Sequence, residues 1–334
     1  GCYEDAYQAW ARSRAPEQMD KISLGLPPAR ATWERLMGQA DIVHPEREKK
    51  CAIPFAADDD LTHTAFVADE IMRFISENAG QPFLAIAGFY SPHSPWITPQ
   101  RFLDMYDPAE LSLPDIPEEW DNPAGRATIT EEELRSVRQG YYGMISEVDH
   151  HVGRILDHLV EKGLADNTIV FFVSDHGEYL GDYRTYGKGA PGNDCISRVP
   201  CIVRWPTGAE AGTTATGLTE AIDVLPTILD VCSIPIPRSV QGKSFRPALE
   251  GDATHGKTSA LTESAPCTSI RTDSYRYVCY KDGRELLYDH SSDPGEYIDV
   301  SQRSDYAGIL ADHRHQMLQR LLTTTLPKRR EWAY

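Results

Sequence analysis

Asp175 and His176 are adjacent and follow an apolar run, TIVFFV, at residues 168–173. An aspartate and a histidine at the end of one strand can offer a carboxylate oxygen and an imidazole nitrogen to the same divalent metal ion. Lys188 follows in YGKG (186–189), where the glycines let the backbone come close to a ligand. A lysine there would act as a point charge for a sulfate or phosphate oxygen.

His93 is a further candidate for the same site. It follows a second apolar run, FLAIAGFY (83–90), and lies in the proline-rich segment SPHSPWITP (91–99). Because ligands of open α/β sheets bind beyond the carboxyl ends of the strands, we expect both polar segments at one edge of a sheet. Structural roles stay open: Asp175 could cap a helix, His93 could be a turn residue and Lys188 a solvated lysine.

Other histidines and acids receive structural assignments from their positions. His150 and His151 lie within a charged helical stretch, and His313 and His315 lie within the last predicted helix. We expect all four histidine side chains to lie on solvent-exposed faces of their helices. The acidic run 58–60 stands in a polar stretch before a helix, where a capping or solvated role is expected.

The order of predicted elements indicates an α/β protein. Apolar residues at helical spacing predict helices, whereas short apolar runs without alternation predict strands buried on both faces, as in a parallel sheet covered by helices. The predicted helices are 64–78, 131–162 and 219–231, and the predicted strands are 83–90, 168–173 and 201–205. Residues 1 to 60 are polar and predict irregular structure over a surface.

The chain changes character after about residue 255. The segments 275–280 and 285–289 are separated by the turn signal KDGR and predict a hairpin, and an amphipathic helix is expected near 304–322. We therefore predict an α/β catalytic domain at 1–255 and a small α+β subdomain at 256–334.

Composition limits the classes of partner. The chain has 334 residues, 41% of them hydrophobic, and a formal net charge of −17. The acidic balance argues against nucleic acid as a partner, since binding to the phosphate backbone needs a basic face. No apolar run approaches the roughly 20 residues of a membrane helix, which argues against a membrane-spanning role.

The seven cysteines show no zinc-binding spacing and are odd in number. Scattered, mostly buried thiols are the favoured interpretation. A disulfide between Cys195 and Cys201, or between Cys267 and Cys279, remains open.

The segment PFLAIAGFYSPHSPWITPQRFLDMYD (82–107) resembles the sulfatase family of the alkaline phosphatase superfamily. The stretch 141–182, ending in SDHGEYLGD, is similar to the long helix, strand and Asp-His-Gly-Glu turn of that family. YGKG and RVPCIVRWP (198–206) follow in family order, and later segments extend the resemblance over about residues 60 to 320. It implies an alkaline-phosphatase-like mixed, mostly parallel sheet flanked by helices, with a small C-terminal subdomain of antiparallel strands and a helix.

Carried over by residue, the resemblance implies that Asp175 and His176 are metal ligands. His93 and Lys188 would hold the sulfate group and neutralise the departing oxygen. One divalent ion is implied, with Ca²⁺ as first choice and Mn²⁺ or Mg²⁺ as alternatives. Where the family has Gly-Asp-His after the metal pair, this chain has Tyr183 in place of the histidine.

The nucleophile motif of the family, a Cys-x-Pro-x-Arg whose cysteine becomes formylglycine, is not found in this sequence. Cys267 and Arg271 fit a looser form of it, but that segment leads into a predicted strand rather than a helix N-terminus. We therefore expect the N-terminal strands and the nucleophile to be absent from this chain, which would supply part of the site and be inactive alone.

The expected function is that of a sulfuric ester hydrolase acting on a small anionic sulfate ester. The alternatives are a phosphonate monoester or phosphodiester hydrolase of the same superfamily, and a non-catalytic sulfatase-like binding protein. An N-terminal fragment of the same protein is a candidate partner, and so is a second copy of the chain.

Overall fold

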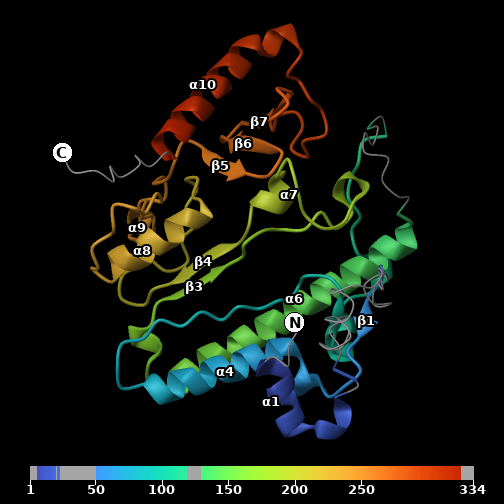
Figure 1. Ribbon diagram of the computed structural model, residues 1–334, viewed down its shortest axis with the longest axis vertical. Coiled ribbons are helices and arrows are strands. Elements are labelled where there is room, and N and C mark those ends of the chain that lie inside the picture. Colours follow the sequence, from blue (N-terminus) through green and yellow to red (C-terminus); the bar gives the residue numbers. More distant parts are fainter. Residues whose placement is uncertain (1–5, 20, 23–49, 119, 121–128, 325–334) are drawn as a thin grey trace, which may run out of the picture. The chain divides into compact units, whose positions relative to one another are not determined.

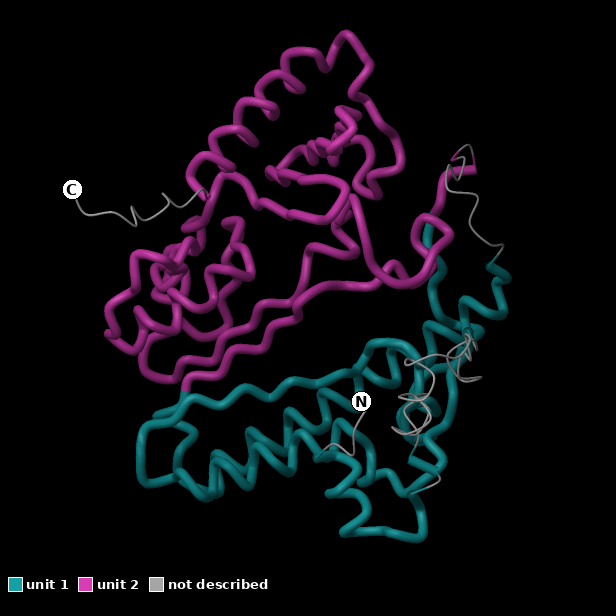
Figure 2. Tube along the Cα trace, viewed as in Figure 1, with its two compact units in different colours: residues 1–115, 125–168 teal, residues 116–124, 169–334 magenta. Residues whose placement is uncertain are grey.

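The computed structural model describes residues 6–19, 21–22, 50–118, 120 and 129–324 (Figure 1). Its chain divides into two compact units. Unit 1 comprises residues 1–115 and 125–168, and unit 2 comprises residues 116–124 and 169–334 (Figure 2). The predicted division at residue 255 stays a prediction.

Unit 1 is mostly helical. Its helices and strands are α1 (Ala6–Arg14), β1 (Ile53–Pro54), α4 (His63–Asn78), β2 (Ile97–Thr98), α5 (Gln100–Leu103) and α6 (Glu131–Glu161), with the 3₁₀ helices η1 (Pro16–Gln18), η2 (Asp59–Leu61), η3 (Pro108–Glu110) and η4 (Ala165–Asn167). The strands β1 and β2 form a short parallel pair. Helices α4 and α6 lie side by side (Figure 1) and confirm the two helices predicted in this region.

Both long helices, α4 and α6, begin directly after a threonine that caps the first helical turn. The Thr62 side chain accepts a hydrogen bond from the amide of Ala65 at the start of α4, and Thr130 does the same for Glu133 in α6. Such caps satisfy amides that the first helical turn leaves without partners. Three glutamates in the first turn of α6 also suit the positive end of the helix dipole.

Helix α1 corrects the prediction of irregular structure before residue 60. Tyr7 and Ala11 stand four residues apart, so they share one helical face, and both are buried in a core with Phe55 and Leu61. The Tyr7 hydroxyl donates to the Leu61 carbonyl oxygen at 2.7 Å. The short apolar pattern was missed because polar residues surround it.

The strand predicted at residues 83–90 is also wrong, because these residues form no strand with any described residue. Every second side chain is solvent-exposed, with Leu84 70% and Ile86 82% exposed. A β-strand is defined by hydrogen bonds to a neighbour, so an apolar run predicts a strand only where a partner strand is available.

Unit 2 contains two sheets. Its elements are β3 (Val170–Val173), η5 (Asp182–Arg184), α7 (Asp194–Ser197), β4 (Cys201–Arg204), η6 (Ala221–Asp223), α8 (Val224–Val231), α9 (Arg246–Leu249), β5 (Ala260–Glu263), β6 (Cys267–Arg271), β7 (Tyr275–Tyr280), β8 (Glu285–Asp289), η7 (Ser304–Tyr306) and α10 (Ala307–Thr324). Strands β3 and β4 were expected to be buried on both faces, but they form an antiparallel pair with exposed side chains such as Ile202.

Strands β5 to β8 form an antiparallel sheet in sequence order, and α10 packs against it. Ile270, Tyr277 and Leu287 of the sheet are buried with Leu310 and Met317 of the helix. This arrangement confirms the predicted hairpin and final helix.

Some side chains differ from their expected exposure. His151 and His313 are buried, whereas His150 and His315 are exposed as expected. His313 is satisfied within the fold, because its Nδ1 donates to the Ile309 carbonyl oxygen at 2.8 Å. An amphipathic pattern marks a helix but does not tell which polar residues at the edge of its apolar face become covered.

The described cysteines are free thiols, so neither of the two disulfides left open is formed. Only Cys267 among them is buried, which corrects the expectation of mostly buried thiols. It begins strand β6, in agreement with the assignment of its segment to a strand. Cys2 lies outside the described residues. None of the described helices is long and apolar enough to cross a membrane.

Glu147 of α6 is a buried acid, and we predict that it links the stability of the fold to pH. It is 1% exposed, and its Oε2 accepts a hydrogen bond from Thr98 at 2.8 Å. Burial raises its pKa above the ordinary 4.5, against the opposing effect of nearby threonine hydroxyls. A raised carboxyl pKa stabilises the fold at low pH, and that stabilisation is lost as pH rises through the folded-state pKa.

We therefore expect Glu147→Gln to become more stable than the wild type as pH rises above 4.5. Urea unfolding of both proteins at pH 4, 6 and 8 measures the difference. A difference in unfolding free energy that stays constant over this range would show that Glu147 does not titrate differently in the two states.

Candidate active site

The Asp175–His176 pair lies directly after β3, on a turn that packs against α7. The amide of Gly177 donates to the Ile196 carbonyl oxygen at 2.7 Å. A Cβ at Gly177 would stand 2.0 Å from the Cys195 carbonyl oxygen, so only glycine fits there. This close approach holds the turn that carries the two candidate metal ligands.

The hydrogen bonds of His176 define its tautomer. Its Nδ1 lies 2.8 Å from the Gly177 carbonyl oxygen, which can only accept, so Nδ1 carries the proton. Nε2 therefore carries the lone pair of the neutral ring and can accept. It lies 2.7 Å from Lys188 Nζ and 3.7 Å from Asp175 Oδ2. The Asp175 carboxylate is 87% exposed and open to a ligand.

Lys188 reaches His176 because Glu178 connects the two loops. The Glu178 Oε1 accepts from the amides of Gly187 and Leu180. Gly187 has a φ of +84°, in the left-handed region that glycine adopts without strain. The structure thus brings together three of the four predicted site residues.

His93 belongs to unit 1 and is exposed. Its Nδ1 lies 2.7 Å from the Ser94 carbonyl oxygen and therefore carries a proton, while the Tyr90 hydroxyl donates to the same oxygen at 2.9 Å. Its Nε2 is directed away from these bonds. A shared role of His93 with the unit 2 residues stays a prediction.

The sulfatase family model matches residues 24–234, and the model for the C-terminal part of N-sulphoglucosamine sulphohydrolase matches residues 181–323. The chain belongs to the sulfatase family.

Known sulfatases and related hydrolases resemble the chain over most of its length. An arylsulfatase of Clostridium perfringens is 28% identical, over 98% of this chain and 67% of the relative. A multifunctional alkaline phosphatase superfamily protein of Trinickia caryophylli is 27% identical, over 83% of this chain and 64% of the relative. The phosphonate monoester hydrolase of Agrobacterium radiobacter has a TM-score of 0.79 at 26% identity, over 97% of this chain and 70% of that one.

These likenesses confirm the predicted fold class, an alkaline-phosphatase-like α/β fold with a C-terminal antiparallel sheet and helix. The chain spans about two thirds of the length of the relatives described.

Tyr183, which the resemblance predicts in place of a family histidine, has a packing role in its surroundings. Its ring lies 4.8 Å from that of Tyr297 and also contacts Trp120 and Tyr179. Its hydroxyl donates to the Gly295 carbonyl oxygen at 2.5 Å. Burial, with the negative charge of Glu296, raises the pKa of Tyr183, so the phenol stays protonated.

A second acidic cluster was not anticipated from the sequence. Asp194, His290 and Glu296 present ligand atoms within 4.8 Å of one another, a spacing that would suit a metal ion. Arginine side chains already neutralise the two carboxylates. Arg276 donates to both, at 2.6 Å to Glu296, and Arg271 donates to Asp194 at 3.2 Å. We therefore assign this cluster a structural role.

The pKa values of the two acids agree with that assignment. Burial alone would raise the pKa of Glu296, but its bonds to His290 and Arg276 outweigh burial and the pKa lies below the ordinary value. The same balance holds for Asp194, whose pKa is lowered by Arg271 and Arg276. Asp194, His290 and Glu296 lie far apart in the sequence, so no local pattern marks them as a cluster.

Arg276 is fully buried, so its removal would leave the buried Glu296 without an arginine partner and Asp194 with Arg271 alone. We expect Arg276→Met to lower the free energy of unfolding by about 3–5 kcal/mol. Arg284→Met is the matched control, because Arg284 is 59% exposed on the same hairpin and should cost less than about 0.5 kcal/mol. Chemical denaturation measures both; equal losses would contradict the assigned role of Arg276.

Proposed function

We propose that the chain forms the metal-binding and sulfate-binding part of a sulfuric ester hydrolase. The observation that carries the proposal is the junction of His176 Nε2, Lys188 Nζ and the Asp175 carboxylate after β3. A lone pair, an ammonium group and a carboxylate within one turn offer both a cation site and an anion contact.

Asp175 and His176 fit a divalent ion by the chemistry of their donor atoms. The Nδ1 bond to Gly177 leaves His176 Nε2 deprotonated, which is the form that binds metals. Ca²⁺ is our first choice, with Mn²⁺ or Mg²⁺ as alternatives. Such an ion, when bound, polarises a sulfate oxygen and offsets its charge.

Lys188 and His93 would act on the ester itself. The Lys188 ammonium supplies a positive charge for the equatorial oxygens of the sulfate, where negative charge grows during displacement. His93 holds its Nδ1 proton on Ser94, so its Nε2 is the atom that would face the departing oxygen, and in the doubly protonated ring it would give that oxygen a proton and leave the ring neutral.

The nucleophile of this proposal is a hydrated formylglycine in a part of the protein outside these 334 residues. The sequence contains no Cys-x-Pro-x-Arg, and Cys267 starts strand β6 rather than a helix. Without a nucleophile the covalent route is closed, so the chain alone would be inactive. A segment that supplies the nucleophile is accordingly part of the complete enzyme.

We expect Asp175→Asn in the full-length protein to lower kcat by at least about 100-fold, because the carboxylate charge at the metal is lost. Asp166→Asn is the control, since Asp166 is an exposed acid just before β3. Steady-state kinetics with an aryl sulfate, and calcium binding by calorimetry, measure both variants. Full activity of Asp175→Asn would place the metal elsewhere.

Hydrolysis of phosphonate monoesters or phosphodiesters is the second candidate, favoured by the likeness to a phosphonate monoester hydrolase. Both reactions would use Asp175, His176 and Lys188. The ratio of kcat/KM for an aryl sulfate and the matching aryl phosphonate decides between them. We expect the sulfate to be the faster substrate and a chelator to abolish its turnover.

Faster phosphonate turnover would favour the second candidate. Binding of both esters without turnover of either by the full-length protein would identify a non-catalytic binding protein.

A further inference from the structure

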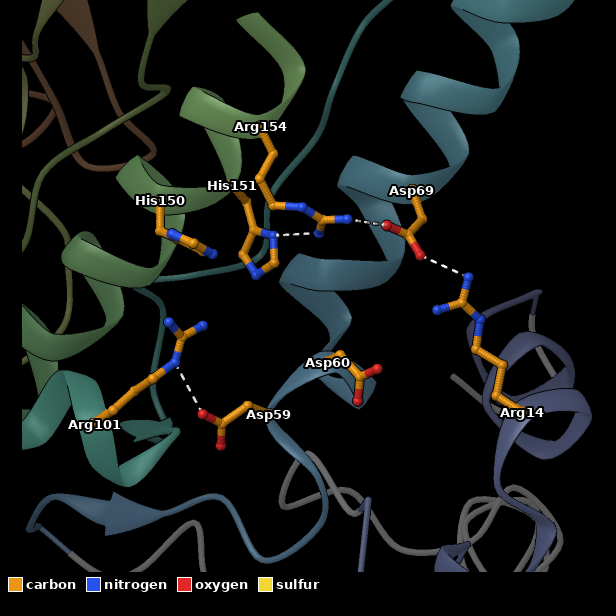
Figure 3. A pocket seen from close by; sticks show the side chains of 8 residues that line it. All are labelled: Arg14, Asp59, Asp60, Asp69, Arg101, His150, His151 and Arg154. Carbon is orange, nitrogen blue, oxygen red and sulfur yellow. Dashed lines mark hydrogen bonds and ion pairs between the residues drawn. The ribbon is translucent and has the colours of Figure 1, made fainter. Parts of the chain in front are cut away.

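Unit 1 contains a cavity of about 260 Å³ that shares no residue with the proposed active site. Elements α1, η2, α4, α5 and α6 contribute to it (Figure 3). Its lining is entirely ionisable and consists of Arg14, Asp59, Asp60, Asp69, Arg101, His150, His151 and Arg154.

His151 has a buried hydrogen-bond donor with no partner among the described residues. Its side chain is 3% exposed, and its Nδ1 lies 3.0 Å from Arg154 Nη1. Arginine can only donate, so Nδ1 accepts and the proton of the neutral ring is on Nε2. Nε2 makes no hydrogen bond to any described residue, and the ring projects into the cavity (Figure 3). A buried donor in this state destabilises the fold, and a ligand that accepts the bond would remove that cost.

Arg101 offers donors to the same space. Its Nε binds Asp59 Oδ2 at 2.9 Å, while its terminal amino groups turn toward His150 and His151 (Figure 3). The guanidinium lies over the Phe102 ring at 4.2 Å, which fixes its plane. A planar guanidinium held in this way can bind two oxygens of one ligand.

Aspartate oxygens at the cavity already accept hydrogen bonds from arginines. The two carboxylate oxygens of Asp69 bind Arg14 at 2.7 Å and Arg154 at 2.8 Å. Asp59 is paired with Arg101, and Asp60 is exposed. Three arginines and three aspartates line the cavity, and Asp69 and Asp59 are paired with arginine. This leaves the terminal amino groups of Arg101 and the Nε2 proton of His151 as donors beside the two histidines.

We propose that this cavity binds a tetrahedral oxyanion, sulfate or phosphate, between Arg101 and the two histidines. The ionised oxygens of such an anion are acceptors, which match the terminal amino groups of Arg101 and the Nε2 proton of His151. It could arrive as the free ion or as the charged group of a larger ester. The proposal does not depend on the proposed hydrolase function.

Protonation of the histidines should be linked to this binding. Burial, with the charges of Arg154 and Arg101, lowers the pKa of His151 to about 4, and burial also lowers the pKa of His150. Asp69 opposes this effect on His151 and Asp149 opposes it on His150. The remaining charged groups at the cavity are Arg14, Asp59 and Asp60. An anion favours the charged ring, so binding should raise both pKa values and strengthen as pH falls.

The test uses the full-length protein carrying Lys188→Ala, which removes the anion contact of the proposed active site. Sodium sulfate and sodium phosphate are titrated against sodium chloride at equal ionic strength, and the ring nitrogen shifts of His150 and His151 report binding by NMR. We expect saturable binding of both oxyanions. Arg101→Gln should weaken it at least about tenfold.

Arg73→Gln is the matched control, because Arg73 is a comparably exposed arginine on α4 and does not line the cavity. It should leave binding unchanged. His151→Phe keeps the ring volume and removes the donor, so it should weaken binding while the unfolding midpoint without anion is kept. A sulfated and an unsulfated monosaccharide, compared with free sulfate, distinguish an ester group from the free ion.

Loss of oxyanion binding with Arg101→Gln but not with Arg73→Gln supports the proposal. Equal effects of the two variants, no shift of the histidine signals, or tight binding of the unsulfated sugar would overturn it. Binding of the free ion in the parent that is lost on Lys188→Ala would also overturn it, because it would place the anion in the other site.

Discussion

The buried guanidinium of Arg276 is the interaction on which the candidate site of unit 2 depends. From strand β7 it binds Glu296 and also Asp194, the first residue of α7. Helix α7 in turn accepts the amide of Gly177 and fixes the turn that presents His176. The C-terminal sheet thus supports the chemistry of a turn that is distant in sequence, through one charge network held away from water.

Two histidines of this chain have opposite tautomers, and the difference decides what each can bind. The Gly177 carbonyl oxygen accepts from Nδ1 of His176 and leaves Nε2 as an acceptor, which suits a metal ion. Arg154 donates to Nδ1 of His151 and leaves Nε2 as a donor, which suits an anion. The partner of one ring nitrogen sets the chemistry of the other.

Local patterns predicted the helices well, because periodicity and capping residues lie within one segment. Asp175 and Lys188 were predicted as site residues because family motifs and strand ends mark them, and the structure places both beside His176. The prediction of a strand at residues 83–90 was wrong because a strand needs a partner strand. The prediction that His151 is exposed was wrong because the burial of a helix edge depends on neighbouring elements. The contacts of Arg276 join residues far apart in the chain, and no single segment contains a signal for them.

The position of Lys188 links the binding of a metal ion to the binding of a sulfate group in the proposed active site. Its ammonium now donates to the Nε2 lone pair of His176 at 2.7 Å, and that lone pair is the one a metal ion would take. The two cations cannot share it, because an sp² nitrogen has one lone pair in the ring plane. A metal at His176 would therefore release Lys188 for the sulfate oxygens. Metal and anion affinities of the site should then rise together, as linkage requires when one ligand frees a contact for the other.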